Sequence, residues 1–390
     1  MESVLSTSFD DIRPVYDSEV PETIEKLLAD DRFRKAVEPV IKPMSWDQWC
    51  SLMRSCKTIN DFQIKIVYPV LNRFIANTTK EVKGFNWDNI KDGLSHVIIS
   101  NHRDIVLDAA FLNILLYSQG MDTTEVAIGD NLLIYPWITH LVRLNKSFIV
   151  KRSVPIREKL ETSRHLSEYI HYTVRERNQS IWIAQREGRA KDSNDHTQVS
   201  LLKMMTLKDS SRPIEMLKAL RIVPLSISYE FDPCDFLKAK EFQLKRDNPH
   251  YKKTPADDLE NMLTGIYGYK GRVYFKFGEG INSKLDKLDL SLPKSSLLEA
   301  AACIIDEEIY RNYIFYPFNY VAYDIMTNSS SFQSEYTAEN KEAFVEYVDK
   351  QIDKIQLKNK DWDFLREKIV EMYGNPVKNF LKVQPTPQFC

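Results

Sequence analysis

The sequence predicts an α/β fold in which a mixed central sheet is flanked by helices, with helical additions at both ends. Two observations support this prediction. Between about residues 95 and 277, short β-rich segments alternate with helical segments, which is the pattern of a sheet with helices packed on its faces. Outside this region, apolar residues recur at helical spacing. We therefore divide the chain into an N-terminal helical region (1–85), an α/β domain (86–285) and a C-terminal helical region (286–390).

The N-terminal region is expected to be helical from about Glu22 to Thr79. Its clearest signal is an apolar stripe at helical spacing, which predicts a packing face. The stripe consists of Ile64, Val67, Leu71, Phe74 and Ile75.

Six strands are expected in the α/β domain, each a short run rich in apolar and β-branched residues. They lie at residues 96–100, 125–128, 147–150, 180–184, 222–229 and 272–277. Helices are expected after the first strand, through Tyr117, and from about Asn131 to Leu144. A longer helix is expected to open at Ser153-Val154-Pro155, with Ser153 as N-cap and Pro155 in the first turn. Its predicted packing stripe is Ile156, Leu160, Leu166, Ile170 and Val174.

The remaining segments give weaker signals. The polar stretch from Glu241 to Asp258 is interpreted as an insertion, and the pattern beyond Leu290 is helical to about Tyr373. The tail from Pro376 to Cys390 is expected to be loose. A dense run of aromatic residues from Tyr310 to Tyr323 suits a membrane interface or a helical core, and we favour the core because no row of basic residues accompanies it.

Composition limits the classes of function. The 390 residues, 43% of them hydrophobic, provide ample material for a core, and a net charge of -2 argues against a general nucleic-acid binder. The five Cys residues lack a CxxC spacing, so we expect a reducing compartment without disulfides. The N-terminus lacks the order of a secretory signal, and the longest apolar run, Ile105 to Tyr117, is too short to span a membrane. We expect a cytoplasmic protein whose membrane contact is peripheral.

A candidate catalytic pair lies where the first predicted strand gives way to a helix. His102 is suited to remove a proton near neutral pH, because imidazole titrates there without a large shift. Asp108 is the only charge in the apolar run from Ile105 to Tyr117, and a buried carboxylate without a partner would be costly. We favour Asp108 as the partner of His102 and Asp104 as the helix cap, although Asp104 remains a second candidate for the partner.

Four segments in order resemble motifs of one enzyme family. They are Asn101-His102-Arg103 with its downstream Asp, Gly129-Asp130-Asn131 leading to Phe148-Ile149-Val150-Lys151-Arg152, Arg186-Glu187-Gly188-Arg189, and Ile222-Val223-Pro224-Leu225-Ser226-Ile227-Ser228-Tyr229. With these segments the chain resembles the glycerolipid acyltransferases, which include the glycerol-3-phosphate and 1-acylglycerol-3-phosphate acyltransferases. The resemblance covers about a third of the chain. It departs from the family in one place, because five residues rather than the usual four separate His102 from Asp108.

The resemblance implies an O-acyltransferase of phospholipid synthesis. It would move a fatty acyl group from acyl-CoA or acyl carrier protein to a glycerophosphate-type acceptor at the inner face of a membrane. We place 1-acylglycerol-3-phosphate first because that reaction is common in the family. The resemblance implies catalytic roles for His102, Asp108 and Asp104, and no cofactor or metal. The residues that it implies for substrate binding are Asn101, Arg103, Lys151, Arg152, Glu187, Gly188 and Arg189.

Residue chemistry supports part of this set. The Arg189 guanidinium can grip a phosphate bidentately, and Gly188 allows close backbone approach. Cys234 has no adjacent base and is interpreted as a structural thiol.

Three alternatives stay open at this point. The acceptor could be glycerol 3-phosphate or another lysolipid. The chain could instead be a catalytically inactive lipid-binding protein of the same fold. It could also be a metal-dependent hydrolase that uses His102, Asp104 and Asp108, or His196 with Asp192 and Asp195.

Overall fold

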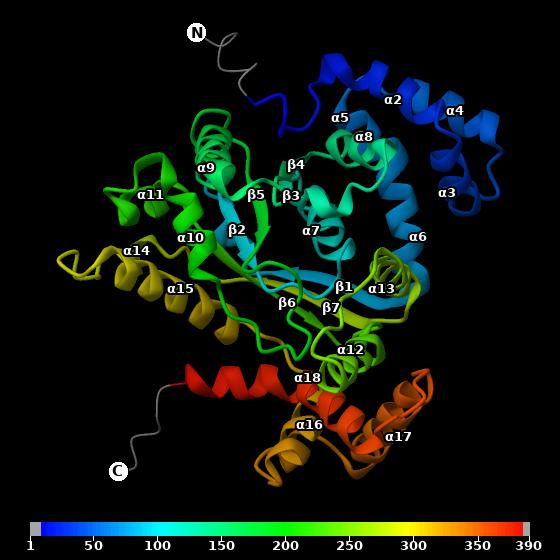
Figure 1. Cartoon of the computed structure of the whole chain (residues 1–390), viewed down its shortest axis with the longest axis vertical. Helices are drawn as coiled ribbons and strands as arrows, with labels where there is room; N and C mark the ends of the chain where they lie inside the picture. The colour runs from blue at the N-terminus through cyan, green and yellow to red at the C-terminus, as the bar shows by residue number, and fades with distance from the viewer. Residues whose placement is uncertain (1–8, 385–390) are drawn as a thin grey trace.

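A seven-stranded sheet forms the centre of the computed structural model, which describes residues 9–384 (Figure 1). The strand order is β1-β7-β6-β2-β5-β3-β4. The strands are β1 (Thr79–Phe85), β2 (Val97–Ser100), β3 (Glu125–Gly129), β4 (Ser147–Val150), β5 (Ile181–Ala184), β6 (Val223–Tyr229) and β7 (Gly271–Phe277). Neighbouring strands are parallel except β6 and β7, which are antiparallel. The sheet is therefore mixed, as predicted.

All six predicted strands are present, and their ends differ from the prediction by one residue at most. The strand β1 was not predicted. It lies at the edge of the sheet beside β7, and its side chains are half-buried or exposed. An edge strand keeps charged residues such as Lys80, Glu81 and Lys83, so its sequence lacks the apolar run that marks a buried strand. The first region of the predicted division thus contributes a strand to the central sheet.

Helices cover both faces of the sheet, as the continuous apolar sequence of β2 requires. Val97 and Ile99 of β2 belong to one core cluster, whereas Ile98 belongs to another, because successive strand residues point to opposite faces. The first cluster is covered by α9 (Lys159–Arg175), α10 (Val199–Met205), α11 (Pro213–Ala219) and α15 (Lys294–Arg311). The second is covered by α6 (Tyr68–Thr78) and α7 (Leu107–Ser118).

The N-terminal helices gather on α8 (Pro136–Leu144) rather than on the sheet, with their own core around Phe33, Phe62 and Leu144. They are α2 (Val20–Leu28), α3 (Asp31–Ile41), α4 (Trp46–Arg54) and α5 (Ile59–Phe62), followed by a π-helical turn, Gln63–Val67, that leads into α6. Of the predicted stripe here, Leu71 is buried in the second sheet cluster and Val67, Phe74 and Ile75 pack against it.

The start of the long helix differs from the prediction. A short 3-10 turn, Ile156–Glu158, precedes α9, which begins at Lys159 rather than near Ser153. Ile156 and Leu160 are 86% and 61% exposed, although both were placed on a packing face. Periodicity identified the helix correctly, but its first turn is exposed among residues 9–384, and of the predicted stripe Leu166, Ile170 and Val174 are buried.

The C-terminal helices form a fourth core with α12 (Asp235–Asp247). They are α16 (Pro317–Thr327), α17 (Ala338–Asp353) and α18 (Trp362–Lys382). The expectation of a loose tail from Pro376 is wrong as far as Lys382, because α18 continues through Pro376 and buries Val377 and Asn379; residues 385–390 lie outside the described part. Tyr310, Tyr313 and Tyr316 are buried, which agrees with the core interpretation of the aromatic run.

The expected insertion at Glu241–Asp258 consists of the end of α12 and the start of α13 (Pro255–Tyr267). A short helix, α14 (Asn282–Leu285), follows β7. Within residues 9–384, no helix combines the length and the apolar character needed to cross a membrane.

Candidate active site

The predicted site residues come together because β2, β5, β6, β3 and β4 share one direction. The carboxyl ends of parallel strands meet at one edge of a sheet, where ligands commonly bind. Ser100 of β2 pairs with Ala184 of β5 and Leu225 of β6. The loop carrying His102 and the loop carrying Arg189 therefore lie beside one another, although 86 residues separate them in sequence.

His102 and Asp108 form a hydrogen-bonded pair at this edge. The imidazole Nδ1 lies 2.8 Å from Asp108 Oδ2, and the side chains are 14% and 0% exposed. The same carboxylate oxygen accepts hydrogen bonds from the backbone N–H groups of Arg103 at 2.6 Å and Asp104 at 3.0 Å. Asp108 is the second residue of α7, where the helix dipole favours a negative charge. The backbone hydrogen bonds thus hold the Asp108 carboxylate in position, and the carboxylate in turn orients the His102 imidazole.

The turn between His102 and α7 accommodates the unusual spacing. Asp104 Oδ1 accepts hydrogen bonds from the backbone N–H groups of Val106 at 2.9 Å and Leu107 at 2.8 Å, so Asp104 caps the start of α7. Burial, and then the charge of Asp108, raise the pKa of Asp104. Of the two acids considered as the partner of His102, Asp108 makes the hydrogen bond and Asp104 makes the cap.

Two aromatic side chains complete the surroundings of the pair. The indole of Trp182 stands edge-on to the His102 ring at 5.7 Å and donates to Ser100 Oγ at 3.0 Å. Tyr229, at the end of β6, is buried, and burial followed by the charges of Asp108 and Asp104 raises its pKa well above the usual value. Its hydroxyl therefore stays protonated beside the Asp108 carboxylate. Trp182 was not singled out from the sequence, and Tyr229 was named only as the last residue of the fourth motif segment.

Asn101 and Arg103 both interact with residues of the fold. The Asn101 amide donates to Ile227 O at 2.9 Å and accepts from Ile227 N at 2.8 Å, which joins the end of β2 to β6. Arg103 is buried, with Nη2 2.9 Å from Asp195 Oδ2, beside a cavity of about 40 Å³ that has room for only a few water molecules. Both residues therefore have partners within the fold, and their roles in substrate binding stay predictions.

Lys151 and Arg152, both implied for substrate binding, form separate ion pairs. Lys151 Nζ lies 2.5 Å from Asp11 Oδ2, at the N-terminal segment. Arg152 Nη1 donates to Glu187 Oε1 at 3.0 Å across the ends of β4 and β5, and both side chains are exposed. Gly188 has φ +68°, which suits glycine, and no atom lies within 4 Å of the position that a Cβ atom would take there.

Arg189 reaches inward from the same loop as Glu187. Its Nη2 donates to Asn261 Oδ1 of α13 at 3.1 Å, while its Nη1 is buried and makes no hydrogen bond within residues 9–384. Burial opposes the charge, but Cys234, Asp104 and Asp232 raise the pKa of Arg189. One buried N–H-bearing nitrogen of the guanidinium, Nη1, therefore has no hydrogen-bond partner within residues 9–384, and it lies next to the loop that carries His102. Asn261 was not singled out from the sequence; it lies just beyond the segment interpreted as an insertion, residues 241–258.

Cys234 has the properties expected of a structural thiol. It is buried, donates to Asn261 O at 3.3 Å, and burial raises its pKa to about 11. It therefore stays protonated and unreactive at neutral pH.

Part of the chain matches a known protein family. Residues 82–228 match the family model described as Acyltransferase. The chain carries an acyltransferase domain. The matched segment contains His102, Asp108 and Arg189, and the predicted enzyme class is thereby confirmed. It ends before α12 and α13, so Asn261 lies outside it.

A search of solved structures finds the crystal structure of the 1-acyl-sn-glycerophosphate (LPA) acyltransferase PlsC from Thermotoga maritima. The two chains are 11% identical, with a TM-score of 0.35. The similarity covers 74% of this chain and 95% of the other. No curated protein matches the sequence.

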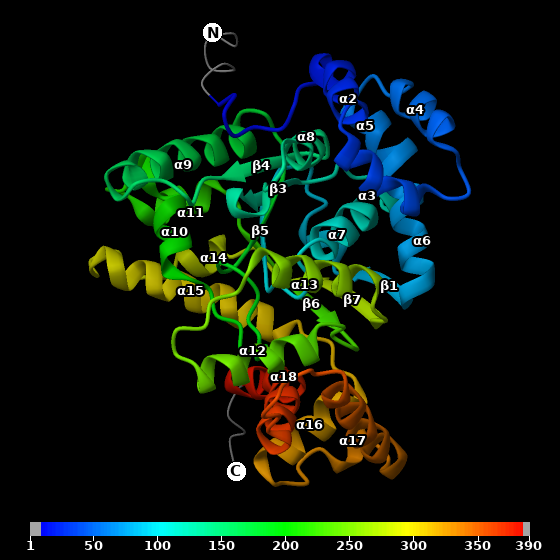
Figure 2. The same ribbon diagram turned by 45° about the vertical axis from the view of Figure 1, so that its right-hand side comes forward.

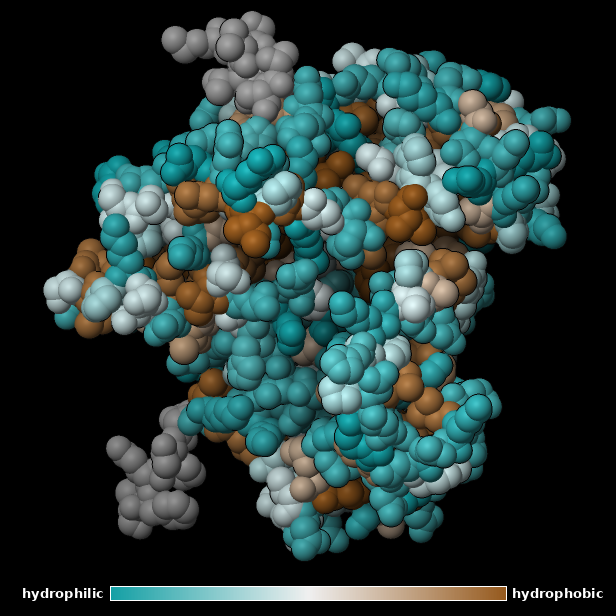
Figure 3. All heavy atoms as spheres, viewed as in Figure 1, coloured by the Kyte–Doolittle hydropathy of each residue, from teal (hydrophilic) through white to brown (hydrophobic). Residues whose placement is uncertain are grey.

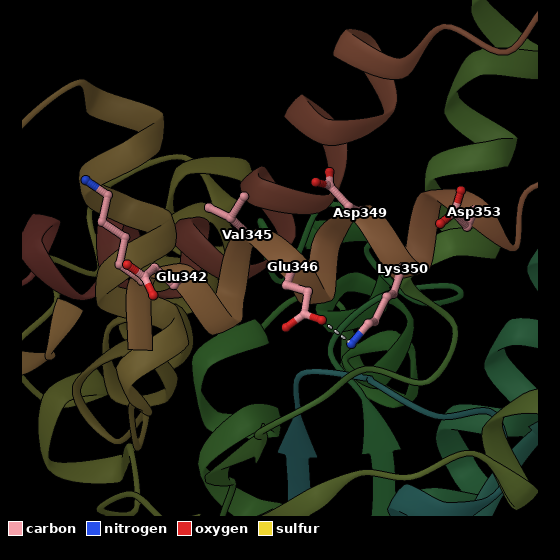
Figure 4. Close-up of a pocket in the computed structure, with 7 residues that line it drawn as sticks. Glu342, Val345, Glu346, Asp349, Lys350 and Asp353 are labelled. Carbon is pink, nitrogen blue, oxygen red and sulfur yellow. Dashed lines mark ion pairs between the residues drawn. The ribbon is translucent and has the colours of Figure 1, made fainter. Parts of the chain in front are cut away.

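Two other features within residues 9–384 contain none of the motif residues. A hollow of about 630 Å³ follows α17, lined by side chains of that helix alone, among them the paired Glu346 and Lys350 (Figure 4). His196 Nδ1 contacts Tyr310 Oη at 2.9 Å, whereas Asp195 faces Arg103, so the second set considered for a hydrolase diverges. Within residues 9–384, no group of three or more His, Cys, Asp and Glu side chains is placed to hold a metal ion.

Proposed function

We propose that this acyltransferase moves a fatty acyl group from acyl-CoA or acyl carrier protein to the free hydroxyl of a glycerolipid precursor. The first candidate for the acceptor is 1-acylglycerol-3-phosphate, in phospholipid synthesis. The observation that carries the proposal is the hydrogen bond between His102 Nδ1 and Asp108 Oδ2, at an edge of the sheet that also holds the open guanidinium of Arg189.

The pair supports general base catalysis. When Nδ1–H donates to Asp108, the tautomer leaves His102 Nε2 as the acceptor for the hydroxyl proton. The acceptor oxygen attacks the thioester carbonyl carbon and forms the new C–O bond as the proton moves to Nε2. The tetrahedral intermediate then expels the thiolate, which takes the proton from the imidazolium. Asp108 stabilises the imidazolium between these steps, and the reaction needs no further cofactor.

The cationic side chains support a phosphate on the acceptor. Arg189 Nη1 has an unused N–H group, and a buried donor of this kind favours a charged partner. Arg152 is held only by the exposed Glu187, and exposed ion pairs contribute little, so a phosphate dianion can replace that carboxylate. Lys151 supports the proposal less, because Asp11 already neutralises it.

Direct assay of lipid products tests the proposal. The purified chain is supplied with acyl-CoA or acyl carrier protein donors and a panel of phosphorylated and unphosphorylated acceptors, and mass spectrometry identifies the esters. We expect phosphatidate from 1-acylglycerol-3-phosphate, and no ester from the His102→Ala variant. Failure to esterify any acceptor, or equal product from the variant, would contradict the proposal. Product from glycerol 3-phosphate or another lysolipid alone would reassign the acceptor.

The proposed site of action is the cytoplasmic face of a membrane, with the protein bound peripherally. The acceptor and product are lipids, so the catalytic edge must meet a bilayer or its monomeric lipids. Cell fractionation with and without high salt would test this location, and recovery of the chain in the soluble fraction under both conditions would contradict it.

A further inference from the structure

The helix α13 carries three large apolar side chains on its outer face, whereas its other large apolar residues, Met262 and Ile266, are half-buried. Its only buried residues are Asn261 and Gly265, a polar and a small residue. Leu259, Leu263 and Tyr267 are 48%, 44% and 55% exposed. A surface helix of a water-soluble protein normally turns its apolar stripe toward the core. In α13, by contrast, the most exposed apolar side chains lie on the outer face, and a polar and a small residue face the core.

The angular positions of these residues around the helix axis show that the exposed leucines lie opposite the buried residues. At about 100° per residue, Leu263 lies about 180° from the midpoint between Asn261 and Gly265. Leu259 and Tyr267 lie one turn before and one turn after Leu263, so the three side chains form a stripe along the outer face. In Figure 2, α13 crosses the outside of the molecule in front of the sheet, between α7 and α12.

The inner face of α13 holds it in this orientation. Asn261 binds the guanidinium of Arg189, and Gly265 lies against the carboxylate of Asp104. At the C-terminal end, the buried Lys270 donates to Gly268 O at 2.6 Å and Ile266 O at 3.2 Å, and also to Thr78 Oγ1 at 3.2 Å. The polar partners of α13 are thus part of the site, and rotating the helix to bury its leucines would break them.

More exposed apolar side chains lie at the same edge of the sheet. Ile134 and Tyr135 follow β3, and Ile156 and Leu160 follow β4; their exposures range from 39% to 86%. Figure 3 shows hydrophobic surface over α13 and, across the middle of the same face, over α8 and beside α9. The apolar surface therefore lies on more than one side of the catalytic loops.

We infer that the outer face of α13 is a docking surface for a phospholipid bilayer, which places the catalytic edge on the lipid. The inference rests on the proposed function, since a lipid acceptor must reach His102 from a membrane. Tyr267 and Tyr269, both more than half exposed at the end of the helix, have the amphipathic character that suits the headgroup layer. The charged residues of α13 are acidic, Asp257, Asp258 and Glu260, so insertion of apolar side chains, rather than attraction to anionic lipid, drives the binding.

Vesicle flotation tests the docking surface. The full chain is mixed with phosphatidylcholine vesicles, with and without phosphatidylglycerol, and the bound fraction is measured for wild type and Leu259→Glu/Leu263→Glu. The double variant is expected to lose affinity about tenfold or more, because binding scales with the apolar area inserted. The matched control is Leu290→Glu/Leu292→Glu, which changes leucines of 61% and 44% exposure beyond α14 and is expected to bind like wild type. Equal loss in both double variants, or no binding by wild type, would overturn the inference.

A fluorescent label distinguishes insertion from a folding defect. In a Cys303→Ser/Cys390→Ser background, Leu263→Cys and Leu290→Cys are each labelled with an environment-sensitive dye; Cys50, Cys56 and Cys234 are buried. Vesicles should shift the emission to the blue at position 263 and leave it unchanged at 290. An unchanged spectrum at both positions contradicts docking through α13, as does self-association through α13 in the absence of vesicles.

Failure of docking and failure of the proposed function give different results. Flotation requires no turnover, so an α13-dependent binder that esterifies no acceptor would keep the inference and reject the reaction. With short-chain, monomeric acceptors, Leu259→Glu/Leu263→Glu is expected to keep wild-type turnover while losing activity on vesicle-embedded acceptor. Equal losses on both acceptors would show that α13 acts on catalysis instead of on membrane binding.

Discussion

Gly265 of α13 lies against the carboxylate of Asp104, so closely that a Cβ atom at position 265 would come within 2.1 Å of Asp104 Oδ2. The other oxygen of that carboxylate caps α7 through Val106 and Leu107. The backbone of α13 is therefore packed onto the residue that fixes the turn after His102. A helix outside the matched acyltransferase segment thus supports the geometry inside it.

Gly265→Ala should disturb both elements. Either Asp104 turns away and the α7 cap is lost, or α13 lifts and the contact between Asn261 and Arg189 breaks. Loss of a cap costs about 1 kcal/mol, so we expect the free energy of unfolding in urea to fall by about 1–2 kcal/mol. Hydrogen exchange at the amides of Val106 and Leu107 should become faster. Thr264→Ala, one residue away, is the control, and equal behaviour of the two variants would contradict this reading of the contact.

His102→Ala should remove the general base. Such a base contributes about 10²–10⁴-fold, so kcat is expected to fall by that order with acceptor binding retained. Asp108→Asn should also lower kcat, because the amide no longer selects the tautomer that leaves Nε2 free. His250→Ala, on an exposed loop, is the control. Steady-state kinetics with the acceptor found by product analysis measures these effects, and a fully active His102→Ala would exclude the mechanism.

Arg189→Ala should weaken binding of a phosphorylated acceptor. A hydrogen bond to a charged group is worth about 1.5–3 kcal/mol, which predicts a rise in acceptor KM on the order of ten- to a hundredfold with little change in kcat. Asn261→Ala should give a smaller rise, since it loosens the guanidinium without removing it. Lys151→Ala serves as the control, because Asp11 holds that side chain. If Arg189→Ala lowers kcat at unaltered acceptor KM, its phosphate role is wrong.

Asp235 should make stability depend on pH. Burial, and then the charge of Asp232, raise the pKa of Asp235 to about 7, from a usual value of 3.8. A raised pKa in the folded protein means that the protonated acid stabilises the fold below pH 4, and this contribution is lost as the pH rises to 7. The difference corresponds to about 4 kcal/mol. In Asp235→Asn the slope of unfolding free energy between pH 4 and 8 should decrease, measured by urea titration; an unchanged slope would show that another group titrates.

Pairing in the sheet explains which parts of the fold were predictable. The strands β2 and β5 are buried on both faces, so their sequences are continuous apolar runs that stand out locally. The edge strand β1 has no such run and was missed. Ile156 and Leu160 were predicted to be buried and are exposed. Helical periodicity identifies an apolar face, but it does not show whether another element covers that face.

The residues of the candidate site also differ in whether local sequence could predict them. The pairing of His102 with Asp108 was predictable because a lone charge in an apolar helix requires a near partner. Tyr229 and Asn261 lie more than 100 residues from that helix in sequence. They reach the site only because β6 lies next to β2 and α13 folds back over the loop, and neither relation is written in local sequence.

The segment between β6 and β7 leaves the sheet and returns to the same place. Tyr229, the last residue of β6, pairs with Val273, near the start of β7, so residues 230–270 begin and end on adjacent strands. A shorter hairpin could join those ends without reordering any strand. The segment could therefore be exchanged as a unit. A transplanted segment would carry α13 and its proposed membrane-binding face to another enzyme, whereas the loop with His102 lies elsewhere in the chain.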